Sequence, residues 1–107
     1  MYLSATMAAK RETNEEIVQA FKEKLDDLSL EQLLERVGKY KDRDAFVALF
    51  EYFAPRIKSF LMKGGTSVEQ ADELAQETML TIWNKAQSYD ANQAKASTWI
   101  FTIARNK

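Results

Sequence analysis

The sequence contains no cysteine and no histidine. Without cysteine, neither a disulfide nor a thiolate zinc site can form, and without histidine most hydrolytic and metal chemistry loses its usual base and ligand. No apolar run approaches the roughly 18 residues of a membrane-spanning helix. The opening residues, MYLSATMAAKRE, lack the apolar core of a signal peptide. The sequence therefore predicts a chain that is neither inserted in a membrane nor exported, and that suits a reducing cytoplasm.

Residues that break helices are also scarce, with three glycines and one proline among 107 residues. The composition is 46% hydrophobic and 29% charged, which is typical of a single folded domain with one modest core. Because helix formers occupy most remaining positions, the sequence predicts an all-α chain, a compact bundle of about four to five helices.

Three pairs of residues have the spacing of a capping box, and two glycine positions mark helix ends. The pairs are Thr13 with Glu16, Ser29 with Gln32 and Thr66 with Glu69, and the stops are Gly38 and Gly64–Gly65. We expect helices over residues 13–27, 29–38, 42–63, 66–87 and 96–107. Pro55 lies inside the third pattern, so that helix is either kinked or restarted there.

The segment 68–86 is amphipathic when placed on a helical wheel. The expected core face comprises Val68, Ala71, Leu74, Ala75, Thr78, Met79, Ile82 and Ala86, with Trp83 at its border. The opposite face comprises Glu69, Glu73, Gln76, Glu77, Leu80 and Asn84. A single exposed leucine is common in soluble proteins. An apolar residue ringed by carboxylates and amides is also typical of a helix-binding surface, where Leu80 would supply the buried contact and the acids would steer the partner.

Charge is divided unevenly along the chain, although the formal net charge is only −1. Four acids and no base lie between residues 69 and 77. Between residues 78 and 107 the balance reverses, with one acid, Asp90, against the bases Lys85, Lys95, Arg105 and Lys107. This split has two interpretations, a random scatter of solvated charge or two surfaces that bind different partners.

The final stretch, STWIFTIARNK, places Trp99, Ile103 and Asn106 at i, i+4 and i+7 on one helical stripe. In one interpretation Trp99 and Ile103 belong to the core and Asn106 is a C-terminal cap. In the other, the Asn106 amide lies at the rim of an apolar pocket that receives a flipped base. The preceding loop would contribute Tyr89, Asn92, Gln93 and Lys95, and the cations Lys95, Arg105 and Lys107 would meet phosphates.

Two stretches resemble region 2 of the bacterial sigma factors, in the extracytoplasmic-function group. The run ADELAQETMLTIWNKAQSYD…STWIFTIARN has the D-x-L-x-Q-E/D-x-x-L-x-x-W core, the S-F/Y-D loop entry and the W-I/L-x-x-I-A-R/V-N ending of that region. DRDAFVALFEYFAPRIKSFLMK resembles its first long helix. The resemblance implies a region 2 domain over residues 30–107 after an N-terminal extension, residues 1–29. Because a complete member continues its recognition helix and adds a second helical domain, we expect this chain to be truncated within that helix.

For the N-terminal extension, apolar residues at helical spacing between Thr13 and Asp27 leave three possibilities open. The segment packs on the domain, docks a partner or stays disordered.

The resemblance implies that the domain binds the clamp helices of the largest subunit of RNA polymerase. In the family this surface is formed by the positions of Asp72, Gln76, Glu77 and Leu80. They match the polar face above, with Asp72 near its edge, and Glu73 lies on the same face. Extracytoplasmic-function factors commonly have an anti-sigma partner that covers the clamp-binding face, so we expect an anti-sigma factor here.

The resemblance also implies that the last helix and its loop recognise and melt the promoter minus-ten element by capturing a flipped base of the non-template strand. Tyr89 matches the aromatic at the loop entry, Ile103 and Asn106 the wall and the amide of the pocket, and Arg105 a backbone contact. Trp99 matches a tryptophan that packs under the recognition helix, and we place Trp83 with it as structural support. We expect no catalytic residue, cofactor or metal, because no bond is made or broken.

Two alternatives remain open on the residues alone. A helical adaptor or regulator without a DNA role would use the acidic face and leave Tyr89 and Asn106 functionally inert. An enzyme fragment would need a catalytic group, and the sequence offers no histidine, cysteine or evident carboxylate pair.

Overall fold

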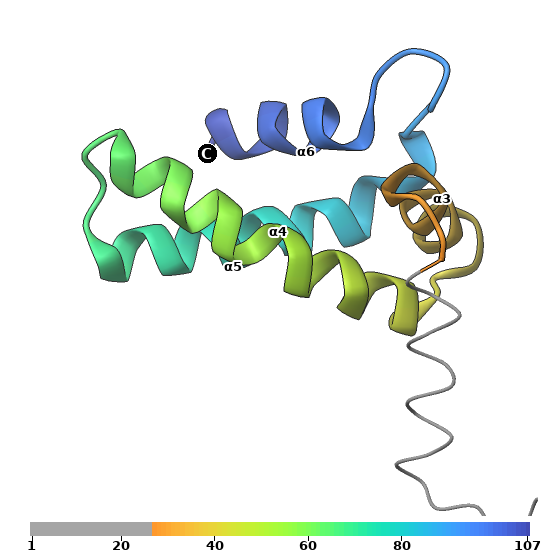
Figure 1. Cartoon of the computed structure of the whole chain (residues 1–107), viewed down its shortest axis with the longest axis horizontal. Helices are drawn as coiled ribbons and strands as arrows, with labels where there is room; N and C mark the ends of the chain where they lie inside the picture. The colour runs from red at the N-terminus through yellow and green to blue at the C-terminus, as the bar shows by residue number, and fades with distance from the viewer. Residues whose placement is uncertain (1–26) are drawn as a thin grey trace, which may run out of the picture.

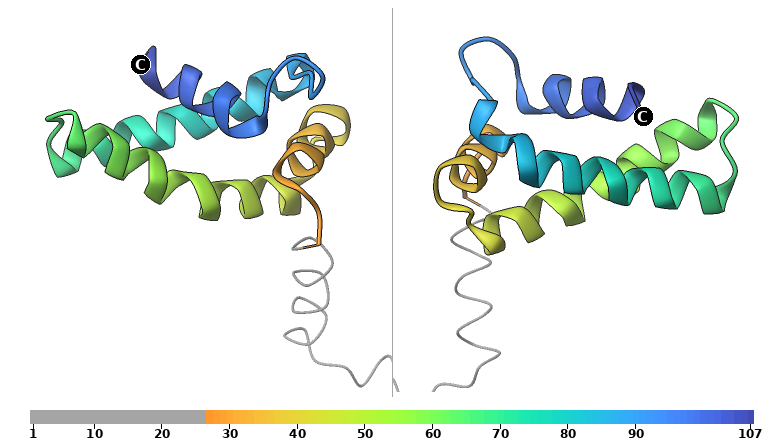
Figure 2. Two further views of the ribbon diagram at one scale, coloured as in Figure 1. Left: turned by 45° about the horizontal axis from the view of Figure 1, so that its top comes forward. Right: turned by 180° about the vertical axis from the view of Figure 1, so that it is seen from behind.

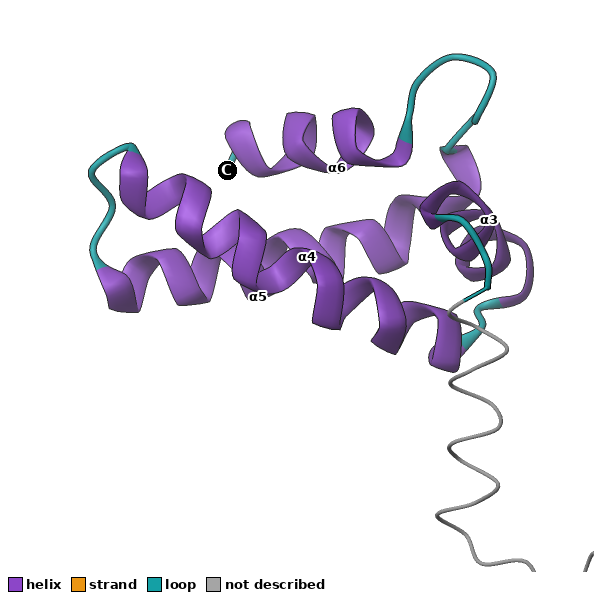
Figure 3. Ribbon diagram, viewed as in Figure 1, coloured by secondary structure: helices purple, strands orange, loops and turns teal. Residues whose placement is uncertain are grey.

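A computed structural model describes residues 27–107. The predictions for the N-terminal extension, including the helix over 13–27 except for its last residue, lie outside these residues. The described part contains four α-helices and one short 3-10 helix (Figures 1 and 3). They are α3 (Leu30–Tyr40), α4 (Arg43–Lys63), α5 (Val68–Lys85), η1 (Ala86–Ser88) and α6 (Ala96–Arg105). The predicted all-α fold is therefore confirmed for this part of the chain.

Helix starts follow the capping chemistry closely, with one correction. The Ser29 hydroxyl accepts from the Gln32 N–H at 3.1 Å, and the Gln32 side chain accepts from the Ser29 N–H at 2.8 Å, which completes the predicted capping box. Asp42 caps α4 by accepting from the Ala45 N–H at 3.1 Å. The predicted cap of α5 at Thr66 is wrong, because Ser67 makes that bond, to the Gln70 N–H at 3.2 Å.

Gly38 does not end α3, in contrast to the prediction. The helix continues to Tyr40 and ends at Lys41, whose φ of 51° is left-handed. A Cβ at Gly38 would lie 2.5 Å from the carbonyl oxygen of Ala86, so only glycine lets α3 approach η1 this closely. The glycine is thus a packing residue rather than a stop.

Pro55 does not interrupt α4, so of the two alternatives predicted there, a kink or a restart, the restart is wrong. The helix runs unbroken from Arg43 to Lys63. Proline removes one intrahelical hydrogen bond, but Phe53 and Ile57 on either side are fully buried. Their burial holds both halves of the helix on the same core.

The second half of the chain has shorter helices than predicted. Lys85 ends α5 and η1 follows, whereas we expected one helix to residue 87. Arg105 ends α6, two residues before the expected end. Its start at Ala96 agrees with the prediction, and its N-cap residue is Lys95.

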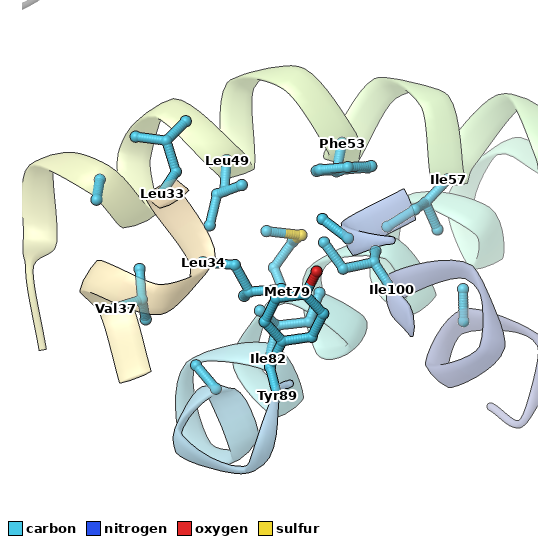
Figure 4. Close-up of a cluster of buried hydrophobic side chains, with 14 of the residues drawn as sticks. Leu33, Leu34, Val37, Leu49, Phe53, Ile57, Met79, Ile82, Tyr89 and Ile100 are labelled. Atoms are coloured by element: carbon cyan, nitrogen blue, oxygen red, sulfur yellow. The ribbon is translucent and has the colours of Figure 1, made fainter. Parts of the chain in front are cut away.

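The hairpin of α4 and α5 forms the long axis, with α3 across one end and α6 alongside (Figures 1 and 2). All four helices contribute to one core (Figure 4). Its largest fully buried side chains are Phe53, Leu34, Leu49, Ile57, Met79, Ile82, Ile100, Val37 and Thr78. The Thr78 hydroxyl donates to the Leu74 carbonyl at 2.7 Å, which satisfies it. Val68, expected in the core, is exposed because it lies at the hairpin end, and Leu74 and Trp83 are half-buried.

Between residues 27 and 107, the helices are all too short or too polar to cross a membrane.

Candidate functional site: an acidic face and the α6 end

The outward side of α5 forms an exposed surface that we call the acidic face. It comprises Glu69, Asp72, Glu73, Gln76, Glu77 and Leu80. Leu80 is 61% exposed, although the fully buried Met79 precedes it. The predicted exposure of these side chains is confirmed, and the face presents one large apolar residue beside carboxylates and an amide.

Few contacts with other residues of the described part, 27–107, restrain the acidic face. The Gln76 amide donates to an Asp72 carboxylate oxygen at 3.2 Å, and the Lys58 ammonium lies 3.7 Å from the other oxygen. Such exposed pairs contribute only about 0–1 kcal/mol each. They orient Asp72 at the edge of the face next to α4, and the remaining acids stay available to a partner.

Trp83 lies at the C-terminal end of α5, below the acidic face. Its half-buried ring packs edge-on against Phe46, with 5.1 Å between ring centroids. The Lys41 ammonium lies 4.7 Å from the Trp83 ring centroid and donates to the Trp83 carbonyl oxygen. A cation at this position also suits the negative end of the helix dipole. These contacts tie the end of α5 to the corner between α3 and α4.

The α6 end, which we define as the loop 89–95 with α6 and the two residues after it, begins with a buried aromatic ring. Tyr89 is 8% exposed, and its hydroxyl donates to the Ala94 carbonyl at 2.8 Å. Its ring meets that of Trp99 edge-on, with 5.4 Å between centroids. Tyr89 belongs to the core cluster (Figure 4), so in this structure its face is not presented to a base. The side chain closes the loop instead.

Burial raises the pKa of the Tyr89 hydroxyl, and the negative charges of Glu31, Glu35 and Asp90 act in the same direction. Three carboxylates therefore act on the start of the loop, whereas cations lie at its end, Lys95, and at the end of α6, Arg105.

Asp90 organises the middle of the loop. Its carboxylate accepts from the Asn92 N–H at 2.9 Å, and its carbonyl accepts from the Gln93 N–H at 3.0 Å. This is an Asx-type turn, in which an aspartate side chain accepts from the backbone N–H two residues further on. The turn leaves the side chains of Asn92 and Lys95 exposed.

The structure divides the predicted stripe on α6. Trp99 and Ile103 are half-buried and pack against the core, whereas Asn106 is exposed at the position that follows the helix. The Asn106 N–H donates to the Ile103 carbonyl at 3.2 Å, and its backbone is not left-handed. Arg105 and Lys107 are exposed on either side of it.

An open cavity of about 380 Å³ lies elsewhere, between α3 and η1. Its lining residues are Glu35, Gly38, Lys39, Ala86, Gln87 and Tyr89. None of them belongs to α6, so this cavity is not the pocket expected beside Asn106.

Glu31 is a residue of the site that sequence reasoning missed. Its carboxylate accepts from the N–H of Ala96, the first residue of α6, at 2.8 Å. The two residues are 65 positions apart, and neither belongs to a local capping motif with the other. No local signal in the sequence could have paired them.

The chain matches the Sigma-70 region 2 family over residues 49–107, more than half of its length. It belongs to the sigma-70 region 2 family. A curated relative from Cereibacter sphaeroides, the ECF RNA polymerase sigma factor RpoE, is 48% identical over 75 residues, which cover 70% of this chain and 41% of the relative. The ECF sigma factor SigW of Bacillus subtilis is 28% identical over 80 residues, covering 75% of this chain and 42% of SigW.

A solved structure gives the same assignment. Rhodobacter sphaeroides SigE, crystallised in complex with the anti-sigma ChrR, superposes with a TM-score of 0.71 at 46% identity, covering 73% of this chain and 44% of SigE. The sigma region 2 resemblance and fold are thus confirmed. The chain spans about two fifths of the length of these relatives.

Membership of the sigma-70 region 2 family also decides the alternative that the chain is an enzyme fragment. Sigma factors are transcription initiation factors and not enzymes, so the interpretation of this region 2 domain as an enzyme fragment is wrong. The family match begins inside α4, at residue 49, so α3 and Glu31 lie outside it.

Proposed function

We propose that this region 2 domain binds the clamp helices of the RNA polymerase largest subunit through the acidic face, and reads the promoter minus-ten element with the α6 end. The observation that carries the proposal is Leu80, which is 61% exposed beside the exposed carboxylates of Glu73 and Glu77. We place the domain at residues 30–107, after an extension over 1–29. The Ser29 capping box supports this boundary.

The acidic face has the composition of a docking surface for a basic helical partner. Leu80 can be buried by the partner, and Asp72, already fixed by Gln76, can accept hydrogen bonds at the rim. Glu73 and Glu77 are free to steer the encounter, because charges at a rim act mainly on the association rate. A buried apolar contact within a polar rim is the usual arrangement of a binding hot spot.

For promoter DNA, we propose that the α6 end supplies both phosphate contacts and a base pocket. Lys95, Arg105 and Lys107 are exposed cations for phosphates, and Asn92 is exposed on the loop. Ile103 and Asn106 form the pocket wall and its amide. Unstacking a base costs a few kcal/mol and stacking in a pocket returns about 1–3 kcal/mol, so the chain alone should hold DNA weakly.

Tyr89 takes a different part in this proposal from the one expected. Because its ring lies in the core, it shapes the loop through the hydrogen bond to Ala94 and the contact with Trp99. Trp99 and Trp83 pack against the core and so help to hold their own helices, α6 and α5, in place.

We further propose that an anti-sigma factor covers the acidic face and that the protein acts in the bacterial cytoplasm. The support is the relative SigE, whose structure is a complex with the anti-sigma ChrR.

A titration against an isolated clamp-helix fragment of the polymerase tests the central proposal. We expect the wild-type chain to bind, and Leu80→Ala and Gln76→Ala each to lose more than about 1 kcal/mol of binding free energy. Val47→Ala is the matched control, because Val47 is an apolar side chain 49% exposed on α4, outside the acidic face. It should bind like wild type.

Equal losses in all three variants would assign the binding to general hydrophobicity and count against the face. No binding by the wild type would reject the clamp proposal. An adaptor without a DNA role would leave DNA binding by Asn106→Ala unchanged, whereas our proposal expects it to weaken.

A further inference from the structure

The first turn of α6 has no capping side chain of its own. Its N-cap residue is Lys95, which makes no side-chain hydrogen bond to the helix and has no acceptor to offer. Helices usually begin with Ser, Thr, Asp or Asn, whose oxygen accepts from an N–H of the first turn. In this chain the carboxylate of Glu31 accepts from the first N–H of α6, that of Ala96.

Glu31 reaches α6 from the first turn of another helix. It is the second residue of α3, where the Ser29 capping box fixes the backbone. Helix N-termini favour negative charge, so one carboxylate lies between the first turns of α3 and α6 and stabilises both. The hydrogen bond is partly buried, which strengthens it against competition from water.

The same bond closes the loop 89–95 at its far end. The loop is held near its start by the Tyr89 hydroxyl, which donates to Ala94, and in its middle by Asp90. Ala96 follows directly, and its bond to Glu31 is the one hydrogen bond that the structure records, among residues 27–107, between this end of the loop and α3, so losing it would loosen that attachment.

We propose that Glu31 is a positioning residue for DNA reading: it sets the start of α6 and the shape of the loop without touching DNA. This inference rests on the proposed function of the α6 end. It goes beyond the family match, which begins at residue 49.

Whether removal of the Glu31 carboxylate weakens or strengthens DNA binding distinguishes a positioning role from simple charge repulsion. Removing a carboxylate near a phosphate-binding surface should strengthen DNA binding, because it removes repulsion. Loss of positioning should weaken it. Glu35 is the matched control, because it lies one turn further along α3 and, like Glu31, its charge acts on Tyr89. Between residues 27 and 107, the Glu35 side chain makes none of the hydrogen bonds that the structure shows.

The test compares wild type, Glu31→Ala, Glu31→Gln and Glu35→Ala in the 107-residue chain. One readout is hydrogen exchange at the Ala96 amide by NMR. The other is the affinity for a fluorescein-labelled single-stranded DNA oligonucleotide selected from a randomised pool on the wild-type chain. For Glu31→Ala we expect exchange at Ala96 to be about tenfold faster, because a hydrogen bond to a charged group is lost, and DNA binding to be several-fold weaker.

Glu31→Gln keeps an acceptor and loses the charge, so it should retain most of the Ala96 protection and bind DNA at least as well as wild type. Glu35→Ala should leave Ala96 protected and DNA binding unchanged or tighter. Weaker DNA binding by Glu35→Ala to the same extent, or unchanged binding by Glu31→Ala, would overturn the inference. If no oligonucleotide can be selected, the proposed DNA contact fails, and exchange at Ala96 still shows whether Glu31 holds the start of α6.

Discussion

The acidic face of α5 and the α6 end carry the two halves of the proposed function, and the fold supports them in opposite ways. On the acidic face, the side-chain hydrogen bonds and ion pairs within residues 27–107 are the Gln76–Asp72 hydrogen bond and the exposed pair of Asp72 with Lys58. At the α6 end, Tyr89 lies in the core and the first amide of α6 is bound from α3.

This difference has a physical origin in what each surface must do. A docking face for a preformed helical partner needs only a rigid helix beneath it, which the buried side of α5 provides. A surface that receives an unstacked base needs a defined loop, and a loop must be tied down because its ordering costs entropy. Substitutions on the acidic face should therefore affect partners alone, whereas those at the α6 end should affect folding as well.

Tyr89→Ala should give the largest loss of stability, which tests directly whether the α6 end contributes to folding. Removing a buried aromatic side chain costs about 3 kcal/mol of unfolding free energy or more, and the Ala94 carbonyl also loses its hydrogen bond. Chemical denaturation measures this. Tyr40→Ala is the control, since Tyr40 is 66% exposed. Similar effects of the two changes would contradict the buried position of Tyr89.

Gly38→Ala should give the next largest effect, because α3 must come close to η1 where the loop begins. A Cβ would meet three backbone atoms of Ala86 and Gln87 at less than 3 Å. Overpacking of this kind costs about 1–3 kcal/mol, more than the helix gains by losing a glycine. Gly64→Ala is the matched control, because its nearest contact would be 3.4 Å. Equal melting temperatures for both variants would contradict the close approach.

Gly38 also shows a feature that local sequence could not predict, namely the close packing of α3 on η1. A glycine ten residues into a helical pattern looks like a stop, and only the approach of η1, far along the chain, explains why the helix continues through it. Local chemistry was sufficient for the Ser29 capping box and for the helical wheel that exposed Leu80.

The same limit applies to the candidate site: the sequence predicts what depends on one helix and not what depends on contacts between distant segments. The acidic face could be read from one helix, because its members share a face by periodicity alone. The burial of Tyr89 and the role of Glu31 could not, because both depend on contacts between α3 and the last third of the chain. The spacing rule led to Thr66 as the cap of α5, whereas the structure has the cap at Ser67.

Tyr89→Phe should give a smaller effect and isolate the hydroxyl. The ring still fills the core, and one hydrogen bond, to the Ala94 carbonyl, is lost, which costs about 1 kcal/mol at neutral pH. Denaturation at neutral pH, with Tyr40→Phe as the control, measures it.

The pH dependence of the same variant gives an independent check. Folding raises the pKa of Tyr89 above its usual value of about 10, mainly through burial. The unfolded chain therefore loses this proton first, so stability is full below about pH 10 and falls as pH rises through the folded pKa. Phenylalanine has no such proton, so the stability difference between wild type and Tyr89→Phe should narrow above pH 10. A widening difference would contradict the raised pKa.

Leu80→Ala should have the smallest effect on stability and the clearest effect on binding. Its side chain is 61% exposed and buries little area on folding, and alanine is an equally good helix former, so the unfolding free energy should change by less than about 0.5 kcal/mol. The same change removes the apolar centre of the acidic face and should weaken binding to the clamp-helix fragment. Denaturation and titration of one preparation measure both quantities. A loss of stability comparable to that of Tyr89→Phe would mean that Leu80 serves the fold, and the contrast between the two regions would then collapse.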